Sequence, residues 1–243
     1  MALGPLILFA IWYGVNAAAL VTPRLLPSPV RTLQSIWTNL PLGLGADFLH
    51  TLSRTMQSFG LAALAGVPIG IVVGSSERLY RSIEFLVDFF RSIPATAMFP
   101  LFMIIFGLGD FSKVAVAAFA AWLVILFNVA YGVLNARQTR ILAARVMGAS
   151  QLRVFSDVLF FECLPQTFVG LRTGVSMALV VIVVAEMFIG ANEGLGKRII
   201  DSQMVFDIPQ LYATILVSGV LGYGLNLCFF ALERRLVHWS GRV

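Results

Sequence analysis

The residues of this chain that could do chemistry are few, and they lie far apart in the sequence. The two histidines are His50 and His238, and the two cysteines, Cys163 and Cys228, lie inside or beside apolar runs. A structural zinc site needs about four clustered ligands, and nucleophilic catalysis needs a base within reach of the nucleophile. No nucleotide-binding loop of the form GxxxxGKS or GxxxxGKT occurs. The sequence therefore predicts no metal, cofactor, catalytic residue or ATPase site.

Two ionisable residues, Arg172 and Glu186, interrupt an otherwise apolar run. Ionisable residues inside a membrane are functional candidates by default. A helix that begins near Leu164 reaches the outer membrane interface at about Glu186, because each residue rises about 1.5 Å. Two interpretations of Glu186 remain open: a structural pairing, with Lys197, Arg198 or a symmetry-related chain, and a role in a gate or pathway. Arg172, about 12 Å into the same helix, is expected to reach the inner interface or to pair with a neighbouring helix.

A charged, amphipathic stretch at residues 137–162 separates two long apolar runs. A protein that only conducts a solute has no need of a structured element of this kind, whereas a protein that receives force from a soluble partner does. Gly148 can end a first short helix in a left-handed conformation, and Ser150 can cap a second one. The pattern predicts two short helices at an angle. Small side chains at the corner, those of Ala143, Ala144 and Ala149, would allow another protein to approach closely.

The composition identifies the surroundings of these residues as a lipid bilayer. Of the 243 residues, 59% are hydrophobic and 12% are charged, with a mean hydropathy of +0.90. A soluble domain carries about 25% charged residues. The formal charge of +5 does not indicate nucleic-acid binding, since the basic residues are scattered between apolar segments. They act there as topology signals.

A transmembrane helix needs about 20 apolar residues, and the sequence predicts six such spans. The third span is the shortest; Pro94 predicts a helix start and Pro100 a kink. The first could be mistaken for a signal peptide, but it lacks a basic first region and a clear cleavage site. The predicted spans are Met1–Pro23, Thr55–Ser76, Ser92–Gly109, Val114–Ala136, Cys163–Asn192 and Ile208–Leu232.

Six spans divide the basic residues outside them into ten on one side and six on the other. The basic-rich side is the cytoplasm, so both termini are predicted to face inward. Between the first two spans, Ser28 and Pro29 predict the start of an amphipathic helix. That helix is expected on the outer surface, with Trp37 at the level of the lipid headgroups.

The residues resemble a known family over about 25–242. The loop reads AAxxxGAS followed by LP and GLR, and RSIP, GLG, VVAEM and ERRL occur in the expected order. This is similar to the permeases of binding-protein-dependent bacterial ABC importers, and in particular to those for sulfonates, taurine and nitrate. The chain departs from the family at Leu142, where Glu is usual, and at Phe161, where Pro is frequent.

The resemblance implies an all-α, type I importer fold: a single multi-pass domain over residues 1–243 in the bacterial inner membrane. It implies that the loop couples to a cytoplasmic ABC ATPase dimer through Ala143, Ala144, Gly148, Ala149 and Ser150. It further implies a solute-binding protein outside the membrane and a second permease copy, with a small polar or anionic solute as cargo.

Three side chains are candidates for the solute pathway or its gate, namely Pro94, Met98 and Glu186. For Met98, packing between helices is the alternative. A secondary transporter or channel that works alone is the alternative function, and it would predict inverted repeats and paired intramembrane charges. A membrane-embedded enzyme is a third reading, and the missing catalytic cluster disfavours it.

Overall fold

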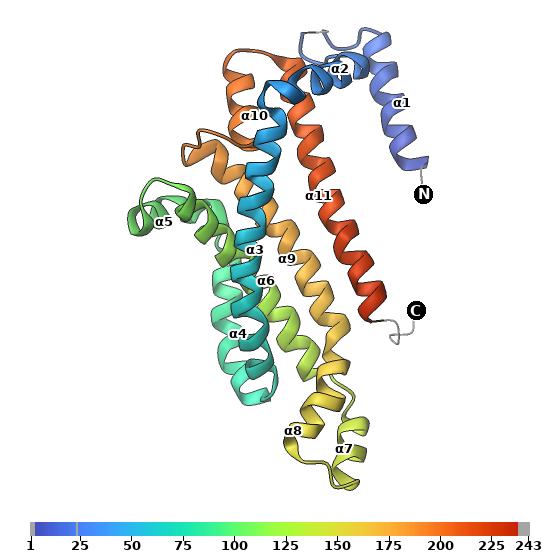
Figure 1. Cartoon of the computed structure of the whole chain (residues 1–243), viewed down its shortest axis with the longest axis vertical. Helices are drawn as coiled ribbons and strands as arrows, with labels where there is room; N and C mark the ends of the chain where they lie inside the picture. Colours follow the sequence, from blue (N-terminus) through green and yellow to red (C-terminus); the bar gives the residue numbers. More distant parts are fainter. Residues whose placement is uncertain (1–2, 23, 238–243) are drawn as a thin grey trace. The chain divides into compact units, whose positions relative to one another are not determined.

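The computed structural model describes residues 3–22 and 24–237, and these residues form helices joined by short turns (Figure 1). The all-helical architecture predicted from composition is confirmed. The chain divides into two compact units, one of Met1–Ser53 with Val183–Gly222 and the other of Arg54–Ile182 with Tyr223–Val243. The predicted ends of the first span, as well as His238 and Arg242, lie outside the described residues.

The first unit begins with α1 (Leu3–Ala17) and α2 (Pro29–Asn39). As predicted, the Ser28 hydroxyl caps α2 by accepting a hydrogen bond from the Arg31 N–H at 3.3 Å, and Pro29 begins the helix. The indole of Trp12 donates to the Pro27 carbonyl at 3.1 Å and stacks on Tyr212, so α1 is fastened to the residues before α2. A kinked segment, Leu40–Leu44, in which Gly43 has φ +103°, then leads into α3 (Gly45–Gly74).

The second unit contains most of α3, followed by α4 (Glu77–Ser92), the 3-10 helix Ala95–Met98, α5 (Phe99–Phe106) and α6 (Asp110–Leu134). The Ser76 hydroxyl caps α4. Two short helices, α7 (Gln138–Val146) and α8 (Gln151–Val154), and the π-helical Phe155–Leu159 precede α9 (Phe160–Phe188). After α10 (Leu195–Met204), which belongs to the first unit, α11 (Ile208–Leu236) ends the described chain.

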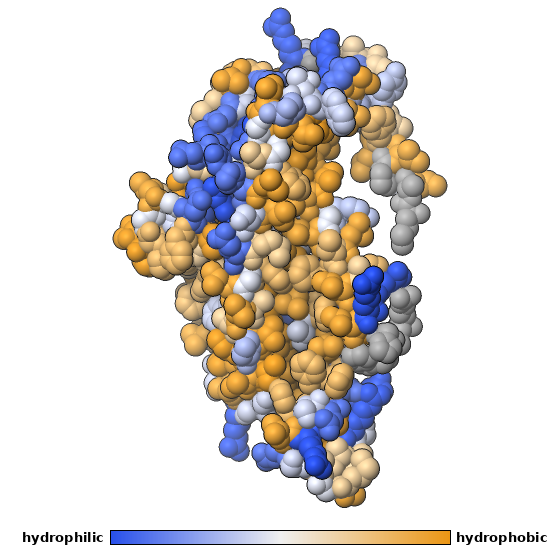
Figure 2. Space-filling model, viewed as in Figure 1, coloured by the Kyte–Doolittle hydropathy of each residue, from blue (hydrophilic) through white to orange (hydrophobic). Residues whose placement is uncertain are grey.

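The core of the second unit lies between α3, α6 and α9. Its buried centre contains Phe59, Ala121, Ile125 and Val175, and the Phe59 ring meets Phe229 of α11 edge-on at 5.0 Å between centroids. Hydrophobic side chains cover most of the visible face of these helices (Figure 2), as expected of helices that contact lipid.

A row of glycines lets α3 lie directly against α6. Gly66, Gly70 and Gly74 follow one another at intervals of four residues, which places them on one face of α3. A Cβ atom added at Gly70 would lie 2.8 Å from both the Leu126 carbonyl oxygen and the Val129 Cβ. The two backbones therefore approach as closely as they do in small-xxx-small packing of membrane helices.

Four helical stretches in the described residues are long and apolar enough to cross a membrane, and a fifth crossing exists if one bent pair counts as a span. The bent pair joins α4 to Ala95–Phe106 at an angle of 86°. A shorter apolar helix, Leu6–Ala17, lies near the N-terminus. The four stretches are Pro29–Gly74, Asp110–Leu134, Gln151–Phe188 and Ile208–Leu236.

Three of the predicted spans differ from the structure. In the described residues, the first is represented by the shorter apolar helix Leu6–Ala17. The helix expected to begin at Thr55 begins ten residues earlier, at Gly45, because Arg54 is accommodated inside it. The span expected over 92–109 is instead the second arm of the bent pair, and the bend lies at Pro94. Pro100 sits in the first turn of α5, where the missing N–H costs no hydrogen bond, so the kink expected there does not form.

Candidate functional site

The stretch predicted to receive force folds as a sharp corner between α7 and α8 (Figure 1). Gly148 has φ +82°, the left-handed conformation expected for it. Its N–H donates to the Arg145 carbonyl at 3.0 Å, and the Ala149 N–H donates to the Ala144 carbonyl at 3.0 Å. This pair of hydrogen bonds is the Schellman motif, which ends α7 and satisfies its last carbonyl groups.

The other arm of the corner is fixed by Ser150. Its hydroxyl accepts a hydrogen bond from the Arg153 N–H at 3.4 Å, as predicted for the cap of α8. The sequence Gly148-Ala149-Ser150 therefore ends one helix and starts the next within three residues, so the angle between them is set locally.

The corner has a small apolar core of its own. Ala136, Ile141, Ala144 and Val154 are buried against one another. Ala144, one of the predicted coupling residues, thus packs inside the corner, whereas Ala143 is exposed and Ala149 is half-buried.

Large apolar side chains cover the outside of the corner. Val146 is 87% exposed and Met147 is 80% exposed. The two positions where the chain departs from the resembled family, Leu142 and Phe161, are exposed as well. Exposed apolar groups gathered around one corner are typical of a surface that another molecule covers.

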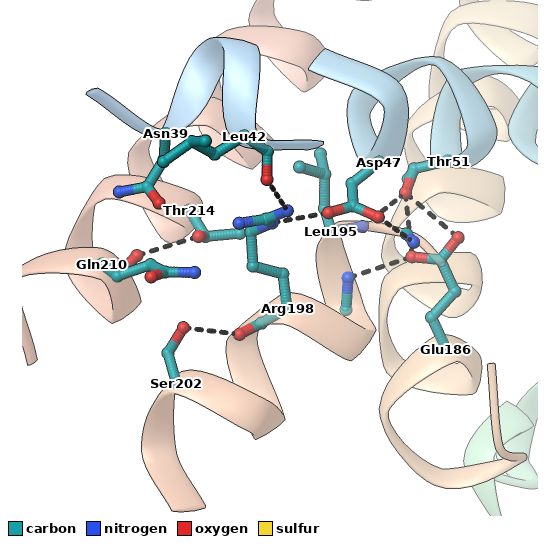
Figure 3. A network of polar contacts seen from close by, with 12 residues as sticks. Asn39, Leu42, Asp47, Thr51, Glu186, Leu195, Arg198, Ser202, Gln210 and Thr214 are labelled. Carbon is teal, nitrogen blue, oxygen red and sulfur yellow. Dashed lines mark hydrogen bonds and ion pairs between the residues drawn. The ribbon is translucent and has the colours of Figure 1, made fainter. Parts of the chain in front are cut away.

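The first unit contains a buried polar network centred on Glu186, which lies near the end of α9 and has no exposed surface (Figure 3). The Thr51 hydroxyl of α3 lies 2.8 and 3.0 Å from the two carboxylate oxygens and donates to this carboxylate. The same hydroxyl accepts from the Leu195 N–H at 2.9 Å, and the Gly196 N–H donates to the Glu186 Oε2 at 3.0 Å.

A second carboxylate, that of Asp47, completes the network. It accepts from the Gly194 N–H at 2.7 Å and pairs with the Arg198 guanidinium at 2.5 Å. Arg198 also donates to the Leu42 carbonyl at 3.3 Å. The first N–H groups of a helix have no partner within the helix. In α10 they are satisfied by side chains of α3 and α9, and two negative charges lie where the helix dipole favours them.

The glycines at the start of α10 are required by this close approach. Gly194 has φ +130°, and a Cβ atom there would lie 2.5 Å from the Glu186 carboxyl group. A Cβ atom at Gly196 would overlap the Val183 carbonyl oxygen of α9. The Gly-Leu-Gly sequence therefore lets the backbone of α10 touch α9 directly.

The predicted partners of Glu186 differ from those found. The charges expected near it, Lys197 and Arg198, form ion pairs with Asp201 and Asp47. Glu186 contacts Thr51 and a backbone N–H, and its side chain is fully buried within the protein. Arg172 lies 3.8 Å from Glu233 of α11, in line with the expected pairing to a neighbouring helix.

The remaining predicted pathway residues lie at the break between α4 and α5. Pro94 precedes the 3-10 helix, and Met98 lines a cavity of 200 Å³ there. Arg91, which the sequence placed in an amphipathic segment on the inner side, between the second and third spans, lies on the same cavity at the end of α4.

Sequence reasoning missed an ion cluster in the second unit. The Arg54 guanidinium lies 3.1 Å from the Asp110 carboxylate, and the Lys113 ammonium lies 3.0 Å from it. Both cations are buried, although the sequence placed them on loops as topology signals. The spacing of three residues between Asp110 and Lys113 was the one feature of the sequence that indicated an ion pair here.

Long apolar helices define a polytopic membrane protein, and its α7–α8 corner presents an apolar surface. The family model described as "Binding-protein-dependent transport system inner membrane component" matches residues 66–240. The chain belongs to this family: it is the permease of a binding-protein-dependent ABC importer and a multi-pass inner membrane protein. Permeases of this kind carry no ATPase domain. A binding-protein-dependent system implies an ATPase and a solute-binding protein as partners.

Relatives match nearly the whole chain. A probable ABC transporter permease of Brucella abortus is 33% identical, with 95% of this chain and 91% of the relative covered. The taurine transport system permease protein TauC of Escherichia coli is 31% identical, with 98% of this chain and 88% of TauC covered. The nitrate import permease protein NrtB of a Synechocystis strain is 28% identical, with 87% of this chain and 80% of NrtB covered.

Solved structures show the same fold. A chain of the MetNI methionine ABC transporter, in an inward-facing conformation, matches with a TM-score of 0.69 and 22% identity, over 82% of this chain and 96% of that chain. A chain from an amino acid ABC transporter matches with a TM-score of 0.63 and 17% identity, over 84% of this chain and 98% of that chain.

Proposed function

We propose that this permease carries a small polar or anionic solute of the sulfonate, taurine or nitrate type. The names of three relatives support the proposal: a taurine permease, a putative aliphatic sulfonate permease of Bacillus subtilis and a nitrate permease. Each matches more than four fifths of this chain.

The geometry of the α7–α8 corner carries the mechanism. Gly148 and Ser150 fix the angle between the two short helices, and the exposed Val146 and Met147 supply an apolar surface for the ATPase. In this proposal Ala143 and Ala149 permit close approach. Ala144 contributes to the coupling from the interior of the corner, because its small side chain lets α7 and α8 pack together.

In the proposed topology the chain crosses the membrane six times and both termini are cytoplasmic. The crossings are α3, α6, α9, α11, the bent α4–α5 pair and α1, which together form one transmembrane domain. Two copies form the pathway, because one chain supplies one corner and the ATPase dimer requires two. Labelling with an impermeant reagent, in a background that lacks Cys163 and Cys228, tests the orientation. Asn192→Cys is expected to react in intact cells, and reaction of Ser150→Cys instead would reverse the topology.

The Glu186 network and the α4–α5 break take different roles in this proposal. Burial and the hydrogen bonds from Thr51 and Gly196 support Glu186 as an anchor that holds α10 against α3 on the outer side. Pro94 and Met98 lie at a break in a membrane-crossing element. Irregular backbone at membrane depth is tolerated where it lines a cavity, which supports a place for them on the pathway.

Transport by the reconstituted complex tests the proposal. The permease is purified with its cognate ATPase and placed in proteoliposomes, and uptake of radiolabelled taurine, ethanesulfonate or nitrate is measured with and without the binding protein. Uptake is expected to require ATP, the binding protein and an ATPase that can hydrolyse ATP. Uptake by the permease alone would instead support a stand-alone transporter, and absence of uptake of all three solutes would refute the proposed solute class.

A further inference from the structure

We propose that Arg91 binds the acidic head group of the solute within the membrane, at the cavity beside the α4–α5 break. The inference rests on the proposed function and adds to it the residue that recognises the solute on its way through the permease. The observations that carry it come from the second unit alone: the cavity, the depth of Arg91, the charged face of α4 and the contacts of the guanidinium.

The cavity has a volume of 200 Å³. Apolar side chains form most of its wall, including Phe90, Met98, Phe119 and Met177. Among the described residues that line it, Arg91 is the charged one. Drug-sized ligands occupy pockets of about 300–1,000 Å³, so this cavity suits a smaller solute, with an apolar body against the methionine and phenylalanine side chains.

In the proposed topology the bent α4–α5 pair is one membrane crossing, and Arg91 lies deep along it. It follows Glu77, the first residue of α4, by 14 residues, and at about 1.5 Å per residue it lies about 21 Å further along the helix axis. The hydrocarbon core of a bilayer is about 30 Å thick. A guanidinium at such depth is costly unless it faces a water-filled pathway or a partner.

The charged face of α4 indicates that this pathway is aqueous. Glu77, Arg81, Glu84, Asp88 and Arg91 follow one another at intervals of four and three residues, which places them on one face of the helix. The buried face, which contains Tyr80 and Val87, packs against α6 instead. A row of five charged side chains cannot face lipid tails, so it faces water, and this row ends at the cavity.

The contacts of Arg91 orient its guanidinium and leave it able to bind an anion. Its central carbon lies over the Phe127 ring, 4.8 Å from the ring centre, a cation–π contact that helps to hold the group in place. The Asp88 carboxylate lies 3.8 Å away, longer than a direct hydrogen bond. A guanidinium presents five N–H donors in a planar fork that matches a carboxylate or sulfonate. Asp88 can attract an amino group, so a solute with both charges, such as taurine, would meet both side chains.

The test uses the complete complex in proteoliposomes with saturating, solute-loaded binding protein. Arg91→Gln is expected to lower the turnover of ethanesulfonate and taurine uptake by about tenfold or more, since a hydrogen bond between charged groups is lost. Arg91→Lys is expected to retain part of the turnover because it keeps the charge. Arg78→Gln, on another exposed face of α4, serves as the matched control and is expected to transport normally.

Further measurements separate recognition of the solute from packing of Arg91 against Phe127. They also separate it from a failure of the proposed solute class. Asp88→Asn is expected to slow uptake of taurine but not of ethanesulfonate. Wild-type turnover in Arg91→Gln would overturn the inference while leaving the import function in place. So would a loss of uptake matched by an equal loss of complex recovery, because that would show that Arg91 only packs against Phe127. If the wild-type complex imports none of these solutes, the proposed solute class fails, and this inference fails with it.

Discussion

The strongest test of the Glu186 network is the replacement of Thr51 by valine, which keeps the shape of the side chain and removes its hydroxyl. The Thr51 side chain is fully buried and makes two kinds of hydrogen bond, donating to Glu186 at 2.8 Å and accepting from the Leu195 N–H at 2.9 Å. A hydrogen bond to a charged group contributes about 1.5–3 kcal/mol, and a buried N–H left without a partner costs about 1–3 kcal/mol. Because the two share one atom, their effects are not additive, and we expect a total loss of about 3 kcal/mol.

The assay is thermal unfolding of the detergent-purified permease–ATPase complex. For a chain of this size, about 1 kcal/mol corresponds to a shift of about 2–4 °C in Tm, so Thr51→Val is expected to lower Tm by about 6–12 °C. Thr51→Ser, which keeps the hydroxyl and loses only a methyl group, is the matched control and is expected to lose much less. Equal Tm values for the valine and serine variants would refute the reasoning, because the hydroxyl would then contribute nothing to stability.

Three further predictions concern the glycines and the corner. Gly196→Ala is expected to lower the Tm of the complex by several degrees, because its Cβ would overlap a backbone oxygen of α9, whereas Gly219→Ala, where the Cβ would meet open space, should not. Gly148→Val is expected to reduce solute-stimulated ATP hydrolysis, because β-branched residues strongly resist a φ of +82°. Gly148→Asn should keep most of this stimulation. Equal stimulation in both variants would show that the left-handed turn is not needed for coupling. Met147→Asp is expected to lower recovery of the ATPase on co-purification at least fivefold, since about 1 kcal/mol or more of apolar contact is lost; full recovery at high salt would place the docking surface elsewhere.

The α7–α8 corner could be predicted from the sequence because its determinants are local. Gly148 and Ser150 act on groups within four residues of themselves, so their types and spacing were enough. The amphipathic start of α2 was predictable for the same reason, since the Ser28 cap acts on a residue three positions away.

The polar network could not be predicted, because its partners are far apart in the sequence. Thr51 and Glu186 are separated by 135 residues, and Asp47 and Gly194 by 147. From the sequence, Glu186 could be recognised only as an unusual residue in an apolar run. The structure adds that its partners include a hydroxyl and a backbone N–H, neither of which has a distinctive sequence pattern.

The predicted span boundaries are wrong where charged residues lie inside helices. Windows free of charged residues stopped at Arg54, which lies inside α3, and at Arg91, which lies in the last turn of α4. Arg54 is compatible with a buried helix because Asp110 lies beside it. A hydropathy window measures the cost of each charge separately, and it therefore cannot see a partner supplied by another helix.

The glycine row of α3 also constrains how this sequence can change over evolutionary time. At Gly70 a larger residue would strike both a carbonyl oxygen and the side chain of Val129, and at Gly74 it would strike Ala130 and Val133. Substitutions at these positions are therefore expected to be accepted only together with a smaller residue or a shifted backbone on α6. In an alignment of permeases, positions 70 and 129 should covary, as should 74 and 133. Gly60, where an added Cβ would meet open space, should instead vary independently.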